Sequence, residues 1–356
     1  MKSMQNQDYL ELLEQGVNSW NEWREKYPWI NPTLEGAVLT NKYLVSCNFR
    51  NMDLRSATFR FSNLERADFE GANLEEICFS ESRLSSANFK GANLEQANFK
   101  EADLVKATFE NANLKFAKLE KADLIGSNFQ KANLQWASLA KADLGWANLE
   151  QANLIYTNLK KANLSKASLK WANLAGANLA RTDLQQADLS WTKLHGINFN
   201  RAYCWGTLFE GANFSMYLGI KRRPGKEGEN FDELDFEEAS LIGAVLEQAK
   251  FDCASLEGVD FSFSDLEEAS LECANLQGAY FIDASLKNAH CENANFKGTL
   301  LIRTDLSGAN FKGANLEESF VCDADVQETS FKDAAMVGIE LVRTDLQQAV
   351  DVNLQQ

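Results

Sequence analysis

The sequence is poor in proline, in histidine and in long apolar runs. Of its 356 residues, three are proline and two are histidine. No run approaches the roughly 18 apolar residues that a membrane-spanning helix needs. The N-terminus, Met1 to Asp8, also lacks the basic-then-apolar pattern of a secretory signal. We therefore expect a cytoplasmic protein with no membrane partner.

Cysteine is scarce, and its spacing excludes two further classes of protein. The seven cysteines are an odd number without CxxC pairs or metal-ligand spacing, which favours free thiols in a reducing compartment over a disulfide framework or a zinc site. We expect no metal and no cofactor. The cysteines are Cys47, Cys78, Cys204, Cys253, Cys273, Cys291 and Cys322.

One pattern dominates the chain: a small residue, then Asn or Asp, then Leu or Phe, repeated every five residues. From Leu34 to Phe214 every fifth residue is Leu or Phe except Cys204, which gives 37 consecutive repeats. Two positions earlier, 31 of these 37 repeats have Ala, Ser or Thr. A period of five fits neither the roughly 3.6 residues of a helix nor the roughly two of a strand. The chain must turn every five residues, with the large and the small residue pointing inward and the Asn or Asp suited to the turn.

The alternation of Phe and Leu sets the number of walls in one coil. Phe and Leu alternate with a period of ten between residues 49 and 109, so a closed coil has an even number of walls. Four walls of five residues give 20 residues per coil, and residues 20 apart should stack about 4.8 Å apart. The expected internal column is Phe49, Phe69, Phe89, Phe109 and Phe129.

These repeats resemble those of the pentapeptide-repeat family over nearly the whole chain. The resemblance implies an all-β fold, a right-handed quadrilateral β-helix with short bridges on each wall. The N-terminal segment is similar to leader segments of cyanobacterial members, which implies the cyanobacterial type with an N-terminal α-helical cap. The resemblance implies little about function, because the family serves several purposes.

Register and composition divide the chain into five segments. Residues 8–26 have apolar residues at helical spacing, so we expect one helix there that caps the first coil. Register is lost near the basic run Lys221 to Arg223, which fits either a bulge on one rod or a joint between two. The predicted segments are a cap at 1–33, a first solenoid arm at 34–214, a basic loop at 215–230, an acidic solenoid arm at 231–346 and a tail at 347–356.

The tail is too short for a capping helix. An uncapped coil exposes strand edges and apolar core. The C-terminal coil is therefore expected to be a docking or self-association surface.

Outward positions 20 apart form columns on the expected surface. One column is basic, the column next to it is aromatic, and two tryptophans stand opposite the basic one. Like charges at this spacing repel by roughly 0.9 kcal/mol per pair in water. Ladder packing could explain the aromatic columns, whereas exposed aromatics beside positive charge are typical of partner interfaces. The candidate partner-binding residues are Lys121, Lys141, Lys161, Arg181, Arg201, Phe116, Trp136, Tyr156, Trp171 and Trp191.

The acidity of the chain is confined to its last third. Residues 34–214 carry 21 Lys or Arg and 19 Asp or Glu, whereas residues 231–356 carry 7 and 25. Over about six coils this is one net charge per roughly 1.6 Å, close to the roughly 1.7 Å of duplex DNA. Some pentapeptide-repeat proteins mimic DNA in the saddle of type II topoisomerases, and this arm resembles such a rod, although the chain lacks a C-terminal dimerisation helix. Acidity could equally serve solubility.

Catalysis is not expected, because a narrow solenoid filled with side chains offers no cleft for convergent ionisable groups. His195 and His290 are at outward positions, and Cys291 is at an inward one. Cys253 and Cys273 fall one coil apart and could share a thiol pair.

The sequence predicts a non-enzymatic protein-protein interaction module or structural rod; the alternative is a DNA mimic that binds a protein such as a type II topoisomerase. Direct binding of nucleic acid is not expected.

Overall fold

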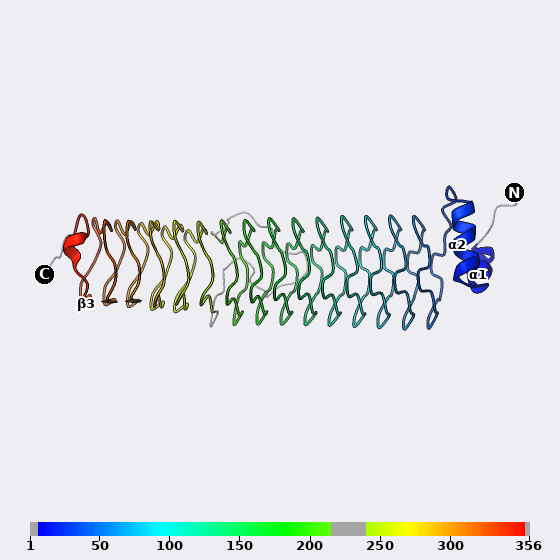
Figure 1. Ribbon diagram of the computed structural model, residues 1–356, viewed down its shortest axis with the longest axis horizontal. Helices are drawn as coiled ribbons and strands as arrows, with labels where there is room; N and C mark the ends of the chain where they lie inside the picture. The colour runs from blue at the N-terminus through cyan, green and yellow to red at the C-terminus, as the bar shows by residue number, and fades with distance from the viewer. Residues whose placement is uncertain (1–5, 215–239, 353–356) are drawn as a thin grey trace, which may run out of the picture. The chain divides into compact units, whose positions relative to one another are not determined.

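The computed structural model describes residues 6–214 and 240–352. It divides into two compact units, Met1–Ser168 and Leu169–Gln356, each built from successive coils of chain (Figure 1). The predicted basic loop at 215–230 and the start of the acidic arm, up to residue 239, lie outside the described residues. None of the helices in the described ranges is long and apolar enough to cross a membrane.

Two helices precede the coils, where the sequence predicted one. Helix α1 spans Asn6–Glu14 and helix α2 spans Val17–Lys26. The break falls at Gly16, whose φ of 114° is outside the helical range and is open to glycine. The prediction of one helix over 8–26 was wrong because the apolar stripe that includes the buried Leu13 and Trp20 runs along both helices.

Side chains of α2 make hydrogen bonds that a further coil would make. In the first unit, bridge residues from Asp53 on donate their N–H to a carbonyl 21 residues earlier, as Asp68 does to Cys47. Asn48 of the first coil instead donates its N–H to Oδ1 of Asn21 at 2.9 Å, and its carbonyl accepts from the indole of Trp20 at 2.7 Å. Nδ2 of Asn21 donates to the carbonyl of Ser46 at 3.0 Å. The two helices fit the predicted cap.

The coils of the first unit close after 20 residues. Parallel bridges join residues 20 apart, four times per coil, as from Asn73 to Asn93 and from Asn93 to Asn113. The Leu or Phe of each repeat and the small residue two positions before it are buried, while the remaining positions are mostly half-buried or exposed. The inward and outward positions predicted from the period of five are therefore confirmed.

The phenylalanines form stacked columns inside the coils. Rings of the predicted column have centroids 4.6 to 5.0 Å apart and interplanar angles of at most 12°. A second column on the opposite wall, Phe59, Phe79 and Phe99, has spacings of 5.3 and 5.1 Å. The two columns meet edge to face, as Phe79 and Phe89 do at 5.8 Å, which is a favourable arrangement of aromatic rings.

Each corner is a turn whose third residue has positive φ. The N–H of Ala37 donates to the carbonyl of Leu34 at 3.0 Å, and Gly36 between them has a φ of 68°. This geometry is that of a type II turn, which favours glycine at its third position. Most corners place another residue there, with φ between 50 and 63°. We call this third residue the corner residue.

The Asn and Asp positions lie in the bridges, one residue before the turn begins. Their side chains still serve the turn, since Oδ1 of Asn48 accepts the N–H of Arg50 at 3.1 Å. They also bond to one another along the walls. Asparagine side chains at 73, 93, 113, 133 and 153 form a ladder with N···O distances of 3.1 to 3.3 Å.

The second unit contains the same coils. Strands β1 (Leu300–Ile302), β2 (Phe320–Cys322) and β3 (Glu340–Val342) form a parallel sheet in the order β1-β2-β3, and a 3₁₀ helix, η1, spans Leu346–Gln348. Tyr203 bridges to Ser240 in parallel. The offset of 37 residues exceeds one coil by 17, and the described coils that end at Phe214 and begin at Ser240 stack directly on each other.

Candidate interaction surface

All ten residues predicted to bind a partner are corner residues. Their φ values lie between 55 and 63°, and none belongs to the buried core. Six of them belong to the first unit: Phe116, Lys121, Trp136, Lys141, Tyr156 and Lys161. The other four, Trp171, Arg181, Trp191 and Arg201, belong to the second.

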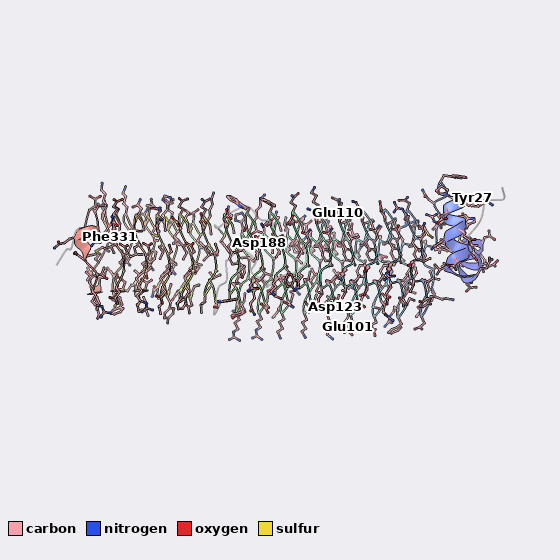
Figure 2. The ribbon with its side chains drawn as sticks, viewed as in Figure 1. Tyr27, Glu101, Glu110, Asp123, Asp188 and Phe331 are labelled. Atoms are coloured by element: carbon pink, nitrogen blue, oxygen red, sulfur yellow. The ribbon has the colours of Figure 1, made fainter. Side chains whose placement is uncertain are left out.

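A corner side chain leans toward the corner residue of the next coil. A Cβ placed on Gly71 would overlap Oδ1 of Asn51, and one placed on Gly211 would overlap the ring of Trp191. Corner residues 20 apart are therefore close enough for direct side-chain contact. Figure 2 labels the corner residue Glu101 and also Glu110, which follows it by nearly half a coil. The two lie on opposite sides of the first unit in Figure 2.

The predicted aromatic column contains a tight ring stack. The rings of Trp136 and Tyr156 have centroids 4.0 Å apart and an interplanar angle of 14°. The backbone holds this spacing, because the N–H of Trp136 donates to the carbonyl of Ile155 at 3.1 Å. Phe116 precedes them in the same column, and the Lys115 ammonium lies 5.0 Å from the centre of its ring.

The first three residues of the predicted basic column, Lys121, Lys141 and Lys161, stack in the first unit, where the column is preceded by an ion-pair partner. The N–H of Lys141 donates to the carbonyl of Lys160 at 3.0 Å, so Lys141 and Lys161 are one rung apart, as predicted. Lys121 instead pairs with Glu101 of the previous coil at 2.8 Å. This pair raises the pKa of Lys121 and lowers the pKa of the Glu101 carboxyl. Lys121 therefore has a partner within its own column, because the same column carries Glu101 one coil earlier.

Two lysines of the column have no ion-pair partner among the described residues. Across the described ranges 6–214 and 240–352, neither Lys141 nor Lys161 takes part in an ion pair. They occupy the corner that follows the Trp136 and Tyr156 corner around the coil. An aromatic stack and two uncompensated positive charges thus border the same wall.

Sequence reasoning missed Trp146, the corner residue after Lys141. Its side chain is 64% exposed, and the Lys166 ammonium lies 4.4 Å from the centre of its ring, within the range of a cation–π interaction. The signal was available, since Trp146 stands ten residues after Trp136 in the same repeat position. It was missed because no aromatic residue stands 20 residues before or after it. We call Trp136, Tyr156, Lys141 and Lys161 the aromatic-lysine face; Trp146, half a coil after Trp136, stands at the opposite corner.

Trp171 and Trp191 of the second unit are exposed corner residues. Trp171 is 55% exposed and Trp191 is 46% exposed. The ring of Trp191 covers Gly211, the corner residue of the next coil. The small neighbour leaves room for the indole to lie along the coils.

The described residues offer little for catalysis. No group of three or more His, Cys, Asp or Glu side chains among them could hold a metal ion. Cys291 is buried while His290 is exposed, so their side chains point apart, as predicted. Burial raises the pKa of Cys47, Cys204 and Cys291, which disfavours the nucleophilic thiolate.

One surface depression of about 300 Å³ lies in the first unit. Its charged lining is largely neutralised, since Arg60 pairs with Glu81 at 3.1 Å and Glu101 pairs with Lys121. The lining residues are Arg60, Cys78, Ser80, Glu81, Asn98, Lys100 and Glu101.

Carboxylates gather on one corner of the second unit. The pKa of Glu247 is raised, first by partial burial and then by the negative charges of Asp265, Glu210, Glu267 and Glu268. Residues 240–352 carry 20 Asp or Glu and 7 Lys or Arg. Four of these seven bases pair with acids inside the unit, at 2.5 to 3.4 Å.

Comparison with solved structures gives several pentapeptide-repeat neighbours. HetL, described as involved in heterocyst differentiation regulation in the cyanobacterium Nostoc sp. strain PCC 7120, is 23% identical; the match covers 87% of this chain and 95% of that one, with a TM-score of 0.23. Rfr23 from the cyanobacterium Cyanothece 51142 is 26% identical; the match covers 33% of this chain and 91% of Rfr23, with a TM-score of 0.30. Full-length QnrB1, a plasmid-mediated fluoroquinolone resistance protein, is 12% identical, with coverages of 87% and 93% and a TM-score of 0.14. At these TM-scores the likenesses carry no argument about function.

Family models match most of the chain, whereas no curated protein matches it significantly. The model described as a pentapeptide repeat region matches residues 62–139 and 82–159. The model of eight-copy pentapeptide repeats matches eight stretches, 33–71, 142–179, 162–201, 230–266, 260–290, 279–317, 289–327 and 309–348. The chain therefore belongs to the pentapeptide-repeat family.

Proposed function

We propose that this protein is a non-enzymatic interaction module whose aromatic-lysine face receives a protein partner. Pentapeptide-repeat proteins are in general non-enzymatic structural or interaction proteins. The observation that carries the proposal is the Trp136 and Tyr156 ring stack beside the uncompensated Lys141 and Lys161.

The face is suited to binding because it is ordered before a partner arrives. Ordering a flexible side chain on binding costs about 0.5 to 1.5 kcal/mol, and the stacked rings are already held against each other. Trp and Tyr are among the residues that dominate interface energies. The free lysines select a partner that presents carboxylates around an apolar centre. Phe116 remains a candidate for extending this surface, and Trp171, Trp191, Arg181 and Arg201 remain candidates for a separate surface of the second unit.

The competing explanation is that the stack only stabilises the coils. A stacked aromatic pair contributes about 0.5 to 1.5 kcal/mol beyond its burial, and that contribution needs no partner. The two explanations differ in what mutation removes. Loss of packing lowers the stability of the coils, whereas loss of an interface lowers binding while the coils persist.

Affinity capture with the whole chain tests the proposal. The N-terminal segment resembles cyanobacterial leaders, so a cyanobacterial lysate is the first source of partners. A captured protein would be purified, and its affinity measured for wild type, for Trp136→Ala with Tyr156→Ala, and for Lys141→Glu with Lys161→Glu. We expect each double variant to bind at least about tenfold more weakly.

The matched control is Phe263→Ala, which removes an exposed aromatic corner residue of the second unit. It should leave affinity unchanged. Trp171→Ala with Trp191→Ala shows whether the second unit contributes. Equal affinities for wild type and both face variants, with unchanged circular dichroism, would refute the proposal.

DNA mimicry is a second candidate, favoured by the carboxylates around Glu247. Residues 240–352 carry a net charge of −13, which over their coils is one charge per roughly 2 Å, near the roughly 1.7 Å of duplex DNA. Inhibition of supercoiling by a type II topoisomerase, weakening steeply with salt, would support this reading. Supercoiling that is unaffected by the purified protein at low salt would exclude it for that enzyme.

We also propose a cytoplasmic location. Cys253 and Cys273 are both exposed, free thiols, and exposed free thiols persist in a reducing compartment. Fractionation with an antibody against the chain tests this location.

A further inference from the structure

Two exposed cysteines occupy neighbouring corners of the second unit. Cys253 and Cys273 are corner residues of successive coils, with φ values of 57 and 58°. Both are exposed, whereas the other five cysteines are buried or half-buried. This pair is the place on the chain where two accessible thiols meet.

The backbone sets their separation within the range of a disulfide. The N–H of Cys253 donates to the carbonyl of Glu272 at 2.8 Å, so the two corners are one rung apart. Adjacent strands are about 4.8 Å apart, and the Cα atoms of bonded cysteines lie about 4.4 to 6.8 Å apart. The Cα separation of one rung therefore permits a disulfide.

At other corners of this unit, the side chains of successive corner residues reach each other. Nε2 of Gln248 donates to the carboxylate of Glu268 at 3.1 Å, and Nε of Arg303 donates to that of Asp283 at 2.6 Å. Each pair joins corner residues 20 apart. The Cys273 thiol is close enough to Cys253 to raise the pKa of the Cys253 thiol.

We propose that Cys253 and Cys273 form a reversible disulfide, and that this corner is a modification site for small cationic disulfides. The thiolate of Cys253 attacks a disulfide R–S–S–R, which forms a mixed disulfide and releases one R–S⁻. The thiolate of Cys273 then attacks the Cys253 sulfur, which forms the internal disulfide and releases the second R–S⁻. Each protein thiol gives up one proton, and the small disulfide is reduced by two electrons to two thiols.

Neighbouring carboxylates determine which disulfides react. Asp252 and Glu272 each precede a cysteine of the pair. The pKa of the Cys253 thiol is raised, first by partial burial and then by Cys273, Asp252 and Glu272. Exchange is therefore slow at neutral pH and accelerates as the pH rises, because the thiolate is the nucleophile. The same carboxylates attract a cationic disulfide and repel an anionic one.

The internal disulfide would join two adjacent coils covalently and enclose 20 residues. It constrains the unfolded chain and so should raise the melting temperature of the second unit. Its formation does not depend on the aromatic-lysine face, which belongs to the first unit.

The test treats the native full-length chain with cystamine, a dication, or with oxidised glutathione, an anion, at equal concentrations. Intact mass should show the loss of two hydrogen atoms, and peptide mapping should join residues 253 and 273. Cystamine should react about tenfold faster at low salt. Asp252→Asn with Glu272→Gln should reduce this preference.

Variants with one cysteine replaced show whether the internal link needs both thiols or whether each thiol reacts alone because it is exposed. Cys253→Ser and Cys273→Ser should each retain one cystamine adduct that the other thiol can no longer displace. Two stable adducts on the wild-type chain without an internal link would overturn the proposal. So would a link from either residue to another cysteine, or equal rates for the two reagents at low salt.

Discussion

Asn21 offers the most direct test of how the N-terminal helices protect the first coil. Its side chain accepts the N–H of Asn48 at 2.9 Å and donates to the carbonyl of Ser46 at 3.0 Å. Asn21→Ala removes both hydrogen bonds and leaves two backbone groups of the coil without partners. An unsatisfied buried group costs about 1 to 3 kcal/mol. Because these groups are partly exposed, we expect a loss of about 1 to 2 kcal/mol in the local stability of the first coil.

A matched variant removes the contribution of helix propensity. Alanine is favoured over asparagine in a helix interior by up to about 0.7 kcal/mol, which partly offsets the loss at Asn21. Asn18 is exposed in the first turn of the same helix, so Asn18→Ala makes the same substitution in α2 without losing the two bonds. The difference between the two variants isolates the contacts with the coil.

Amide hydrogen exchange measures this difference where it arises. Repeat proteins open locally, since each coil contacts only its neighbours. The Asn48 amide should exchange roughly 5 to 30 times faster in Asn21→Ala than in Asn18→Ala, while the amide of Asn148 should be unchanged. Equal exchange at Asn48 in both variants would refute the idea that α2 replaces a missing coil.

Three further predictions concern the core, an ion pair and the C-terminal coil. Phe89→Ala removes a ring stacked at 5.0 and 4.9 Å on its two sides and should cost about 3 to 5 kcal/mol in urea unfolding, whereas the exposed Phe263→Ala should change stability by less than about 0.5 kcal/mol. The Arg343 guanidinium lowers the pKa of Asp323 from 3.8 to about 2. The stabilisation that this ion pair gives the folded chain should therefore disappear as the pH falls from 3.8 to about 2. Arg343→Gln should raise the pKa of Asp323 measured by NMR, and an unchanged value would contradict the pairing. If the C-terminal coil self-associates through the edge of β3, light scattering should show a mass that rises with concentration, and a constant monomer mass excludes it.

The coil could be predicted from the sequence because its core leaves little freedom in the size of the inward side chains. Phe89 and Ala87 sit where only a large and a small side chain fill the space between walls, so the period of five appears directly in the composition. The break at Gly16 could not be predicted, since a helical stripe is insensitive to one glycine between two short helices. The partner of Lys121 was also missed, because corner residues pair along the column and Glu101 falls one coil before the basic run.

The corner positions explain why the fold alone does not determine function. The backbone hydrogen bonds of the turn and of the next coil hold each corner, so the fold does not dictate which side chain stands there. An L side chain at positive φ costs roughly 1 to 2 kcal/mol relative to glycine. At Trp136 and Tyr156 the ring stack offsets part of that cost. At Lys141 and Lys161 the described structure offers no ion pair as an offset, and mutual repulsion adds roughly 0.9 kcal/mol before screening. The stability of the coils accounts least well for these two lysines, which makes them the residues of the face that argue most strongly for a partner.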